Sequence, residues 1–129
     1  MSFKVKAKVF NARHPNQIME DEFLSLISEA KALNSKVFSL IRMQLLSSLA
    51  ELGEDGATYR ELKATLDLSD GALFSNLKSL EEMRYLKSET VRVENKELES
   101  FRITPEGLAQ WNRVKDWLYK FIIRGGQMK

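Results

Sequence analysis

The spacing of hydrophobic residues divides the chain into segments with two different periods. Over residues 3–10 apolar and polar side chains alternate, with Lys4, Lys6 and Lys8 on one side, which indicates a strand. From Ile18 to Leu33 apolar side chains recur at helical spacing behind an acidic first turn, which suits a helix N-terminus. We therefore expect a strand-like arm followed by a first helix.

A second helix is expected to follow, with Asn34 and Ser35 as candidates for its N-terminal cap. Gly53 and the polar residues after it should end this helix. Apolar residues recur at intervals of three or four along the segment and are expected to face a core. They are Phe38, Ile41, Leu45, Leu49 and Leu52.

Two short helices joined by a tight turn are predicted next. Thr58 and Glu61 have the spacing of a capping box, in which the two side chains satisfy free backbone amides at a helix start. Ser69 can cap the following helix, after a turn at residues 67–68. The buried sides of the two helices are expected to carry the leucines Leu62, Leu66, Leu73, Leu77 and Leu80.

After Arg84 the pattern becomes that of strands. Residues 85–93 and 98–103 are separated by a polar turn at 94–97, which predicts a two-stranded hairpin. Thr104 and Pro105 then provide a cap and a first-turn proline for a final helix, expected to run to about Arg124. The predicted fold is mainly α with a small β-hairpin.

The length of 129 residues fits one domain. Within it we expect residues 1–33 to form the arm and first helix, 34–104 a core and 105–129 the last helix. No apolar run approaches the roughly 18 residues of a membrane span, and the first residues lack the apolar stretch of a signal peptide. A cytoplasmic protein without membrane contact is the expectation.

Candidate catalytic chemistry is sparse. The chain has no cysteine, which excludes disulfides, thiolate metal sites and cysteine nucleophiles. Its one histidine, His14, precedes a Pro–Asn turn and is interpreted as a surface residue. Glu81 and Glu82 are adjacent on a predicted helix and point about 100 degrees apart, so they do not form a general acid–base pair. We expect no enzyme, no cofactor and no metal site.

The formal net charge is only +2, and the positive residues concentrate near the two ends of the chain. This distribution is compatible with an anionic partner. It also arises in proteins whose surface charge serves only solubility, so it adds modest weight to any functional hypothesis.

The order of these elements resembles that of winged helix-turn-helix regulators of the MarR-like and ArsR-like families, in their small archaeal and bacterial single-domain form. The similarity lies in residues 57–63, 68–73 and 77–81 for the helix-turn-helix, and in residues 85–86 and 101–107 around the hairpin. It extends over residues 34–110 and implies a winged helix with extra N-terminal and C-terminal helices. In such a fold the second helix of the pair enters the DNA major groove, and the hairpin, called the wing, lies along the backbone or minor groove.

This resemblance implies a transcriptional regulator that binds double-stranded DNA. The predicted helix over residues 69–83 turns a small, polar face away from its leucines, where Ala72, Ser75, Asn76 and Ser79 are expected to contact bases. Relatives commonly have asparagine in place of Ala72 and a lysine or other strong donor in place of Ser75, so other cations must hold the phosphates. The alternative is an ordinary solvated helix face. The full set of expected DNA contacts is Tyr59, Arg60, Ser69, Ala72, Ser75, Asn76, Lys78, Ser79, Lys87, Arg92, Lys96 and Arg102.

Glutamates nearly neutralise the predicted wing, so we expect weak, salt-sensitive DNA binding. They also keep a second hypothesis open, in which the winged helix is a protein-interaction module of a transcription or chromosome assembly. The sequence identifies neither the operator nor the direction of regulation. A small-molecule effector is possible in such families, and the role of the Lys4, Lys6 and Lys8 arm stays open.

The last predicted helix is apolar over about 200 degrees of its circumference, roughly twice what one packed face needs. The excess is expected to meet a second copy of the chain, because the families it resembles dimerise through terminal helices. The alternative is that the first helix covers it within one monomer. The expected dimer interface comprises Phe23, Ile27, Trp111, Val114, Trp117, Leu118, Phe121 and Ile122.

Overall fold

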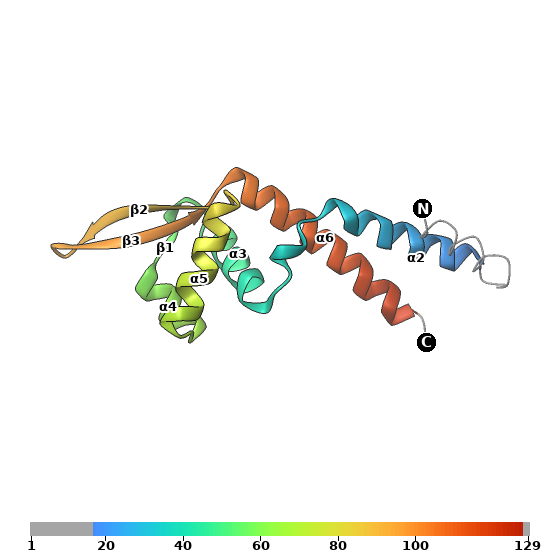
Figure 1. Ribbon diagram of the computed structural model, residues 1–129, viewed down its shortest axis with the longest axis horizontal. Helices are drawn as coiled ribbons and strands as arrows, with labels where there is room; N and C mark the ends of the chain where they lie inside the picture. The colour runs from blue at the N-terminus through green and yellow to red at the C-terminus, as the bar shows by residue number, and fades with distance from the viewer. Residues whose placement is uncertain (1–16, 128–129) are drawn as a thin grey trace. The chain divides into compact units, whose positions relative to one another are not determined.

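The computed structural model describes residues 17–127 (Figure 1). The expected strand over residues 3–10, with its three lysines, and His14 lie outside the described residues. The chain divides into two compact units, one comprising residues 34–113 and the other residues 1–33 together with 114–129. Among the described residues, no helix combines the length and the apolar character that crossing a membrane requires.

The unit of residues 34–113 contains short helices and a three-stranded antiparallel sheet in the order β1-β3-β2, and the long hairpin extends beyond the helices (Figure 1). This confirms the prediction of a mainly α winged helix with a small hairpin. Its elements are η2 (Ser35–Val37), α3 (Leu40–Leu52), η3 (Gly53–Asp55), β1 (Ala57–Thr58), α4 (Tyr59–Leu66), α5 (Asp70–Glu82), β2 (Leu86–Val93), β3 (Lys96–Ile103) and the first part of α6 (Pro105–Gln127).

Helix α3 begins later than predicted. Ser39 is its N-cap and accepts a hydrogen bond from the Arg42 backbone amide at 3.1 Å, whereas Asn34 caps the short 3-10 turn η2. Phe38 therefore lies outside the helix, and the buried residues of α3 are Leu45, Leu46 and Leu49. The Asn34 side chain does not cap α3, because its amide also donates a hydrogen bond to the Tyr85 hydroxyl at 3.1 Å. Phe38 and Leu52 are exposed, so the prediction from spacing that they face the core was wrong.

The helix pair α4–α5 confirms the local sequence signals. The Thr58 amide donates to the Glu61 carboxylate at 2.8 Å, and the Glu61 amide donates to the Thr58 hydroxyl at 3.2 Å, which completes the capping box. Asp67 ends α4 in a left-handed conformation with φ of 54°. Ser69 accepts from the Ala72 amide at 3.2 Å and starts α5. The predicted buried leucines Leu62, Leu73, Leu77 and Leu80 are in the core, and Leu66 is half-buried.

The hairpin turn is shorter than predicted. Only Glu94 and Asn95 form it, both with positive φ, whereas the next residue, Lys96, already pairs with Val93. Such a conformation matches the right-handed twist of the two strands. The sheet gains a strand that the sequence did not predict, because Ala57 in β1 pairs with Phe101 in β3. Two residues are too few to show a period.

The junction between the sheet and α6 is closely packed. Thr104 accepts a hydrogen bond from the Gly107 amide at 2.9 Å and donates to the Arg84 carbonyl at 2.7 Å, which confirms it as the helix cap. A side chain at Gly107 would collide with the backbone carbonyl of Tyr85. Glycine is thus required where the first turn of α6 crosses the end of the loop before β2.

The second unit pairs α2 (Gln17–Glu29), followed by η1 (Ala30–Ala32), with the later part of α6. The expected first helix is confirmed, with a 3-10 turn at its end, while α6 continues three residues past the predicted end at Arg124. The Trp117 indole donates to the Leu26 carbonyl at 2.8 Å and stacks on Phe121 with ring centroids 4.9 Å apart. Charged contacts reinforce this pairing, between Lys120 and Glu29 at 3.9 Å and between Arg124 and Glu22.

Candidate nucleic-acid interface

Helix α5 turns its leucines into the core and presents a face of small and polar residues. Ser75, Lys78 and Glu82 are exposed on this face, and Ala72 and Ser79 are half-buried. Apart from its own helical turn, none of the described residues lies within 4 Å of the place where a side chain on Gly71 would begin. A rigid partner can therefore approach the helix backbone closely at its first turn.

The side chain of Asn76 is held by hydrogen bonds within the chain and is not free to contact a partner. Its carbonyl oxygen accepts from the Arg42 guanidinium at 2.9 Å, and its amide donates to the Ala72 carbonyl at 2.7 Å. Arg42 is itself fixed because it also donates to the Lys36 carbonyl at 2.8 Å. Asn76 thus links α5 to α3, and we omit it from the residues proposed to contact bases.

Helix α4 and the first turn of α5 are joined by a polar cluster of Tyr59, Lys63 and Asp70. The Tyr59 hydroxyl donates to the Asp70 carboxylate at 3.1 Å, and the Lys63 ammonium lies 3.1 Å from the other carboxylate oxygen. Hydrogen bonding to Lys63, with a smaller effect of Tyr59, lowers the pKa of Asp70. Desolvation and the adjacent Asp70 raise the pKa of Tyr59. The negative charge at the start of α5 is therefore partly compensated within the chain.

The cations expected to contact DNA fall into two groups. Arg92 lies 3.6 Å from Glu97, and Arg102 lies 4.0 Å from Glu89, so both arginines face carboxylates of the same hairpin. Four other cations expected to contact DNA, all exposed, have no carboxylate within ion-pair distance among the side chains of residues 21–124. They are Arg60 at the start of α4, Lys78 on α5, Lys87 on β2 and Lys96 beside the hairpin turn.

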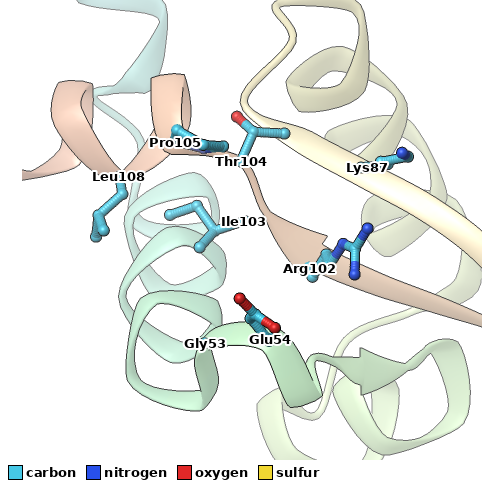
Figure 2. A pocket seen from close by; sticks show the side chains of 8 residues that line it. All are labelled: Gly53, Glu54, Lys87, Arg102, Ile103, Thr104, Pro105 and Leu108. Carbon is cyan, nitrogen blue, oxygen red and sulfur yellow. The ribbon is translucent and has the colours of Figure 1, made fainter.

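A hollow of about 620 Å³ lies at the base of the wing (Figure 2). Its lining comes from η3, both hairpin strands and the start of α6. Apolar Ile103 and Leu108 share it with Glu54 and with the cations Lys87 and Arg102 (Figure 2). Its lining combines one carboxylate with two cations and apolar side chains, so the geometry assigns no effector to it.

The residues expected to form a dimer interface separate by burial. Trp111 and Val114 are buried within one chain, which corrects the expectation that they meet a partner. Phe23, Phe121 and Ile122 are exposed, and Ile27, Trp117 and Leu118 are half-buried. Helix α2 covers part of the wide apolar face of α6, as the monomer alternative anticipated, yet Tyr119 and Ile123 also remain exposed.

Sequence reasoning missed Phe74, an exposed aromatic residue in the first half of α5. Spacing places it about 100 degrees from Leu73, at the flank of the buried stripe. A helical pattern leaves such a flanking residue undecided, because burial there depends on what neighbouring elements cover.

Solved structures with the same fold include several regulators. The transcriptional regulator homologue protein from Pyrococcus horikoshii OT3 is 22% identical, with 78% of this chain and 96% of that chain covered and a TM-score of 0.66. The S. aureus MepR–DNA complex is 12% identical, with 87% of each chain covered and a TM-score of 0.61. A PadR family transcriptional regulator from Eggerthella lenta DSM 2243 is 22% identical, with 86% and 96% covered and a TM-score of 0.57. At these identities the likeness establishes the fold.

No curated protein matches the sequence significantly. A family model described as a winged helix DNA-binding domain matches residues 41–122, from within α3 to the later part of α6. The matched region includes the capped helix pair, the wing and the long helix whose geometry is given above. The chain therefore belongs to the family of winged helix DNA-binding domains.

Proposed function

We propose that the protein is a transcriptional regulator that binds specific sequences of duplex DNA as a homodimer. The observation that carries the proposal is the exposed small, polar face of α5, held in place by Leu73, Leu77 and Leu80 behind it. A major groove admits an α-helix, and small side chains allow its backbone to approach the base edges. The MepR structure, solved as a complex with DNA, and the regulators with this fold support the same role.

The proposed base contacts come from Ala72, Ser75 and Ser79 on α5. Exposed cations that form no ion pair with another described residue are the first candidates for phosphate contacts, since forming such a contact breaks no ion pair. These are Arg60, Lys78, Lys87 and Lys96, supported by the Ser69 hydroxyl. Tyr59, Arg92 and Arg102 have partners within the chain, so a phosphate must replace or share them. Binding should therefore be weak and should fall with salt by about 0.9 in log affinity per phosphate contact.

Dimerisation is proposed to use the unit formed by α2 and the later part of α6. Two helices cannot enclose a core, and this pair leaves Phe23, Tyr119, Phe121, Ile122 and Ile123 exposed. A symmetric contact between two copies would cover these side chains and present two α5 helices to a two-fold symmetric site.

The DNA proposal is tested by replacing Ser75 and Ser79 together with glutamate. Both side chains point away from the leucine core, so the fold should persist, while two carboxylates in the groove would repel phosphates. Specific binding should weaken by at least ~1 to 3 kcal/mol, the range for a good base contact. Lys96→Ala is the matched control and should weaken all duplexes about equally, because phosphate contacts carry little sequence information. A folded double variant that binds like the wild type would instead favour the protein-interaction hypothesis.

The dimer proposal is tested by light scattering. A chain of 14.9 kDa should give a particle of about twice that mass. Replacing Ile122 with aspartate should give monomers, because it places a charge in the proposed contact between two copies. The Ile122 side chain is exposed, so its replacement should leave the packing within one chain unchanged. Glu82→Ala, on the exposed face of α5, is the control and should stay dimeric. A wild-type monomer at micromolar concentration would contradict the proposal.

A further inference from the structure

Phe74 stands out among the aromatic residues of the winged-helix unit. Its exposed fraction is 61%, whereas the other four phenylalanines that the structure describes have exposed fractions between 3% and 38%. It belongs to the fifth position of α5, between Asp70 one turn before and Lys78 one turn after. The first half of a recognition helix is the part that reaches base edges.

The surroundings of the ring favour an uncharged partner. Phe74 lines a hollow of about 170 Å³ between α5, Tyr59 of α4 and the wing. Two carboxylates, Glu81 and Glu99, line the same hollow with one cation, Lys78. A phosphate would meet two negative charges there, and the phenyl ring offers it no hydrogen bond. An uncharged, apolar group fits the ring better.

We infer that Phe74 contacts the C5-methyl group of a thymine in the major groove and makes that thymine a preferred base in each half-site. Among the base edges of the major groove, thymine alone presents a methyl group, and apolar side chains contact it. The inference rests on the proposed DNA binding and adds to it an apolar specificity contact beside the polar face formed by Ser75 and Ser79. It also explains why a large apolar side chain stays exposed beside the small, polar face of α5.

The test begins with selection of bound sequences from a random duplex pool by the full-length wild-type protein. Each thymine of the selected duplex is then replaced singly by uracil, which removes the methyl group and leaves every hydrogen-bonding atom in place. One thymine per half-site should be sensitive, with an affinity loss of about fourfold, as expected for one buried methyl-sized group. The other thymines should tolerate the replacement.

Variants link this sensitivity to the ring. Phe74→Ser should lose the difference between thymine and uracil at the sensitive position, whereas Phe74→Leu should retain most of it because the side chain stays apolar. Leu40→Ala removes another exposed apolar side chain, at the start of α3, and should leave the difference unchanged. Equal thermal melts of the variants should accompany these results, since the Phe74 ring contributes little to the core.

The outcomes separate this inference from the proposed function. If the wild type selects no sequence, DNA recognition fails and the inference fails with it. If it selects a site in which no thymine is sensitive to uracil, or if Phe74→Ser keeps the sensitivity, the inference alone is overturned. Phe74→Ser could instead lower the particle mass in light scattering while uracil replacement has no effect on DNA binding. In that case the ring belongs to a protein contact, and the inference is again overturned.

Discussion

The two units of the chain differ in how completely they cover their own apolar side chains. In residues 34–113 the leucines that face the core are almost fully buried between helices and the sheet, namely Leu45, Leu46 and Leu49 of α3 and Leu73, Leu77 and Leu80 of α5. In the unit formed by α2 and the later part of α6, Leu26 and Val114 are the buried apolar residues among those described. The first unit therefore has a core of its own, whereas the second has one apolar layer without a cover.

Different interactions therefore stabilise each of the two units. The winged-helix unit depends on buried hydrocarbon, which contributes most of the free energy of folding. The helix pair depends on the Trp117 hydrogen bond, ring stacking and ion pairs such as Lys120–Glu29. Exposed ion pairs contribute little. The winged-helix unit therefore encloses a core of its own, whereas the helix pair leaves most of its apolar surface uncovered.

The largest expected effect comes from truncating matched apolar residues in the two units. Leu49→Ala removes a side chain that is 0% exposed and should lower the free energy of unfolding by about 2 to 5 kcal/mol. Ile122→Ala removes one that is 65% exposed and should cost within about 0.5 kcal/mol in the isolated chain. Urea unfolding at low protein concentration measures both. Equal losses would contradict the difference between the units.

Glycine substitutions test the packing inside the winged-helix unit. Gly107→Ala puts a methyl group against the Tyr85 carbonyl and should cost about 1 to 3 kcal/mol in unfolding free energy, as overpacking does. Gly71→Ala is the matched control, because no described residue outside its own helical turn lies within 4 Å of the new side chain. It should stabilise the protein by about 0.4 to 1 kcal/mol through the unfolded chain. A Gly107→Ala protein as stable as the wild type would show that this junction is loose.

Trp117→Phe tests the helix pair. The change removes the indole donor to the Leu26 carbonyl while an aromatic ring remains, so we expect a loss of about 0.5 to 1.5 kcal/mol in unfolding free energy. Tyr119→Phe, also on α6, is the control and should have no effect because its side chain is exposed. Thermal denaturation followed by circular dichroism measures both. An unchanged melting temperature for Trp117→Phe would show that this hydrogen bond does not stabilise the helix pair.

The smallest effect is expected at Asp70, which is largely exposed. Because Lys63 and Tyr59 lower the pKa of Asp70 in the folded state, its ionised form stabilises the fold above the ordinary value of 3.8. This contribution should disappear as the pH falls below 3.8 through the lowered pKa. Asp70→Asn should therefore be slightly less stable than the wild type at neutral pH and equal to it in acid. A difference in melting temperature that persists in acid would assign the effect to something other than this charge.

Local signals in the sequence predicted the parts of the fold that depend on neighbouring residues. The capping box of Thr58 and Glu61, the Ser69 cap and the Thr104–Pro105 helix start each act within a few residues, so a short stretch of sequence is enough to predict them. The leucine spacing of α5 likewise predicted which face of the helix is buried. These signals also placed the candidate recognition helix.

Tertiary contacts decided the remaining features, because they join residues far apart in the chain. Asn34 donates a hydrogen bond to Tyr85, and Ser39 caps α3 in its place. Arg42 donates a hydrogen bond to Asn76, which keeps the Asn76 side chain from contacting a partner of α5. Burial of Trp111 and exposure of Phe74 likewise depend on which elements cover them. The sequence by itself determined the helices, the hairpin and their caps, since those depend on local hydrogen bonds and periodicity. Only the tertiary structure decided which side chains remain available to DNA or to a second chain, because availability depends on what the rest of the fold encloses.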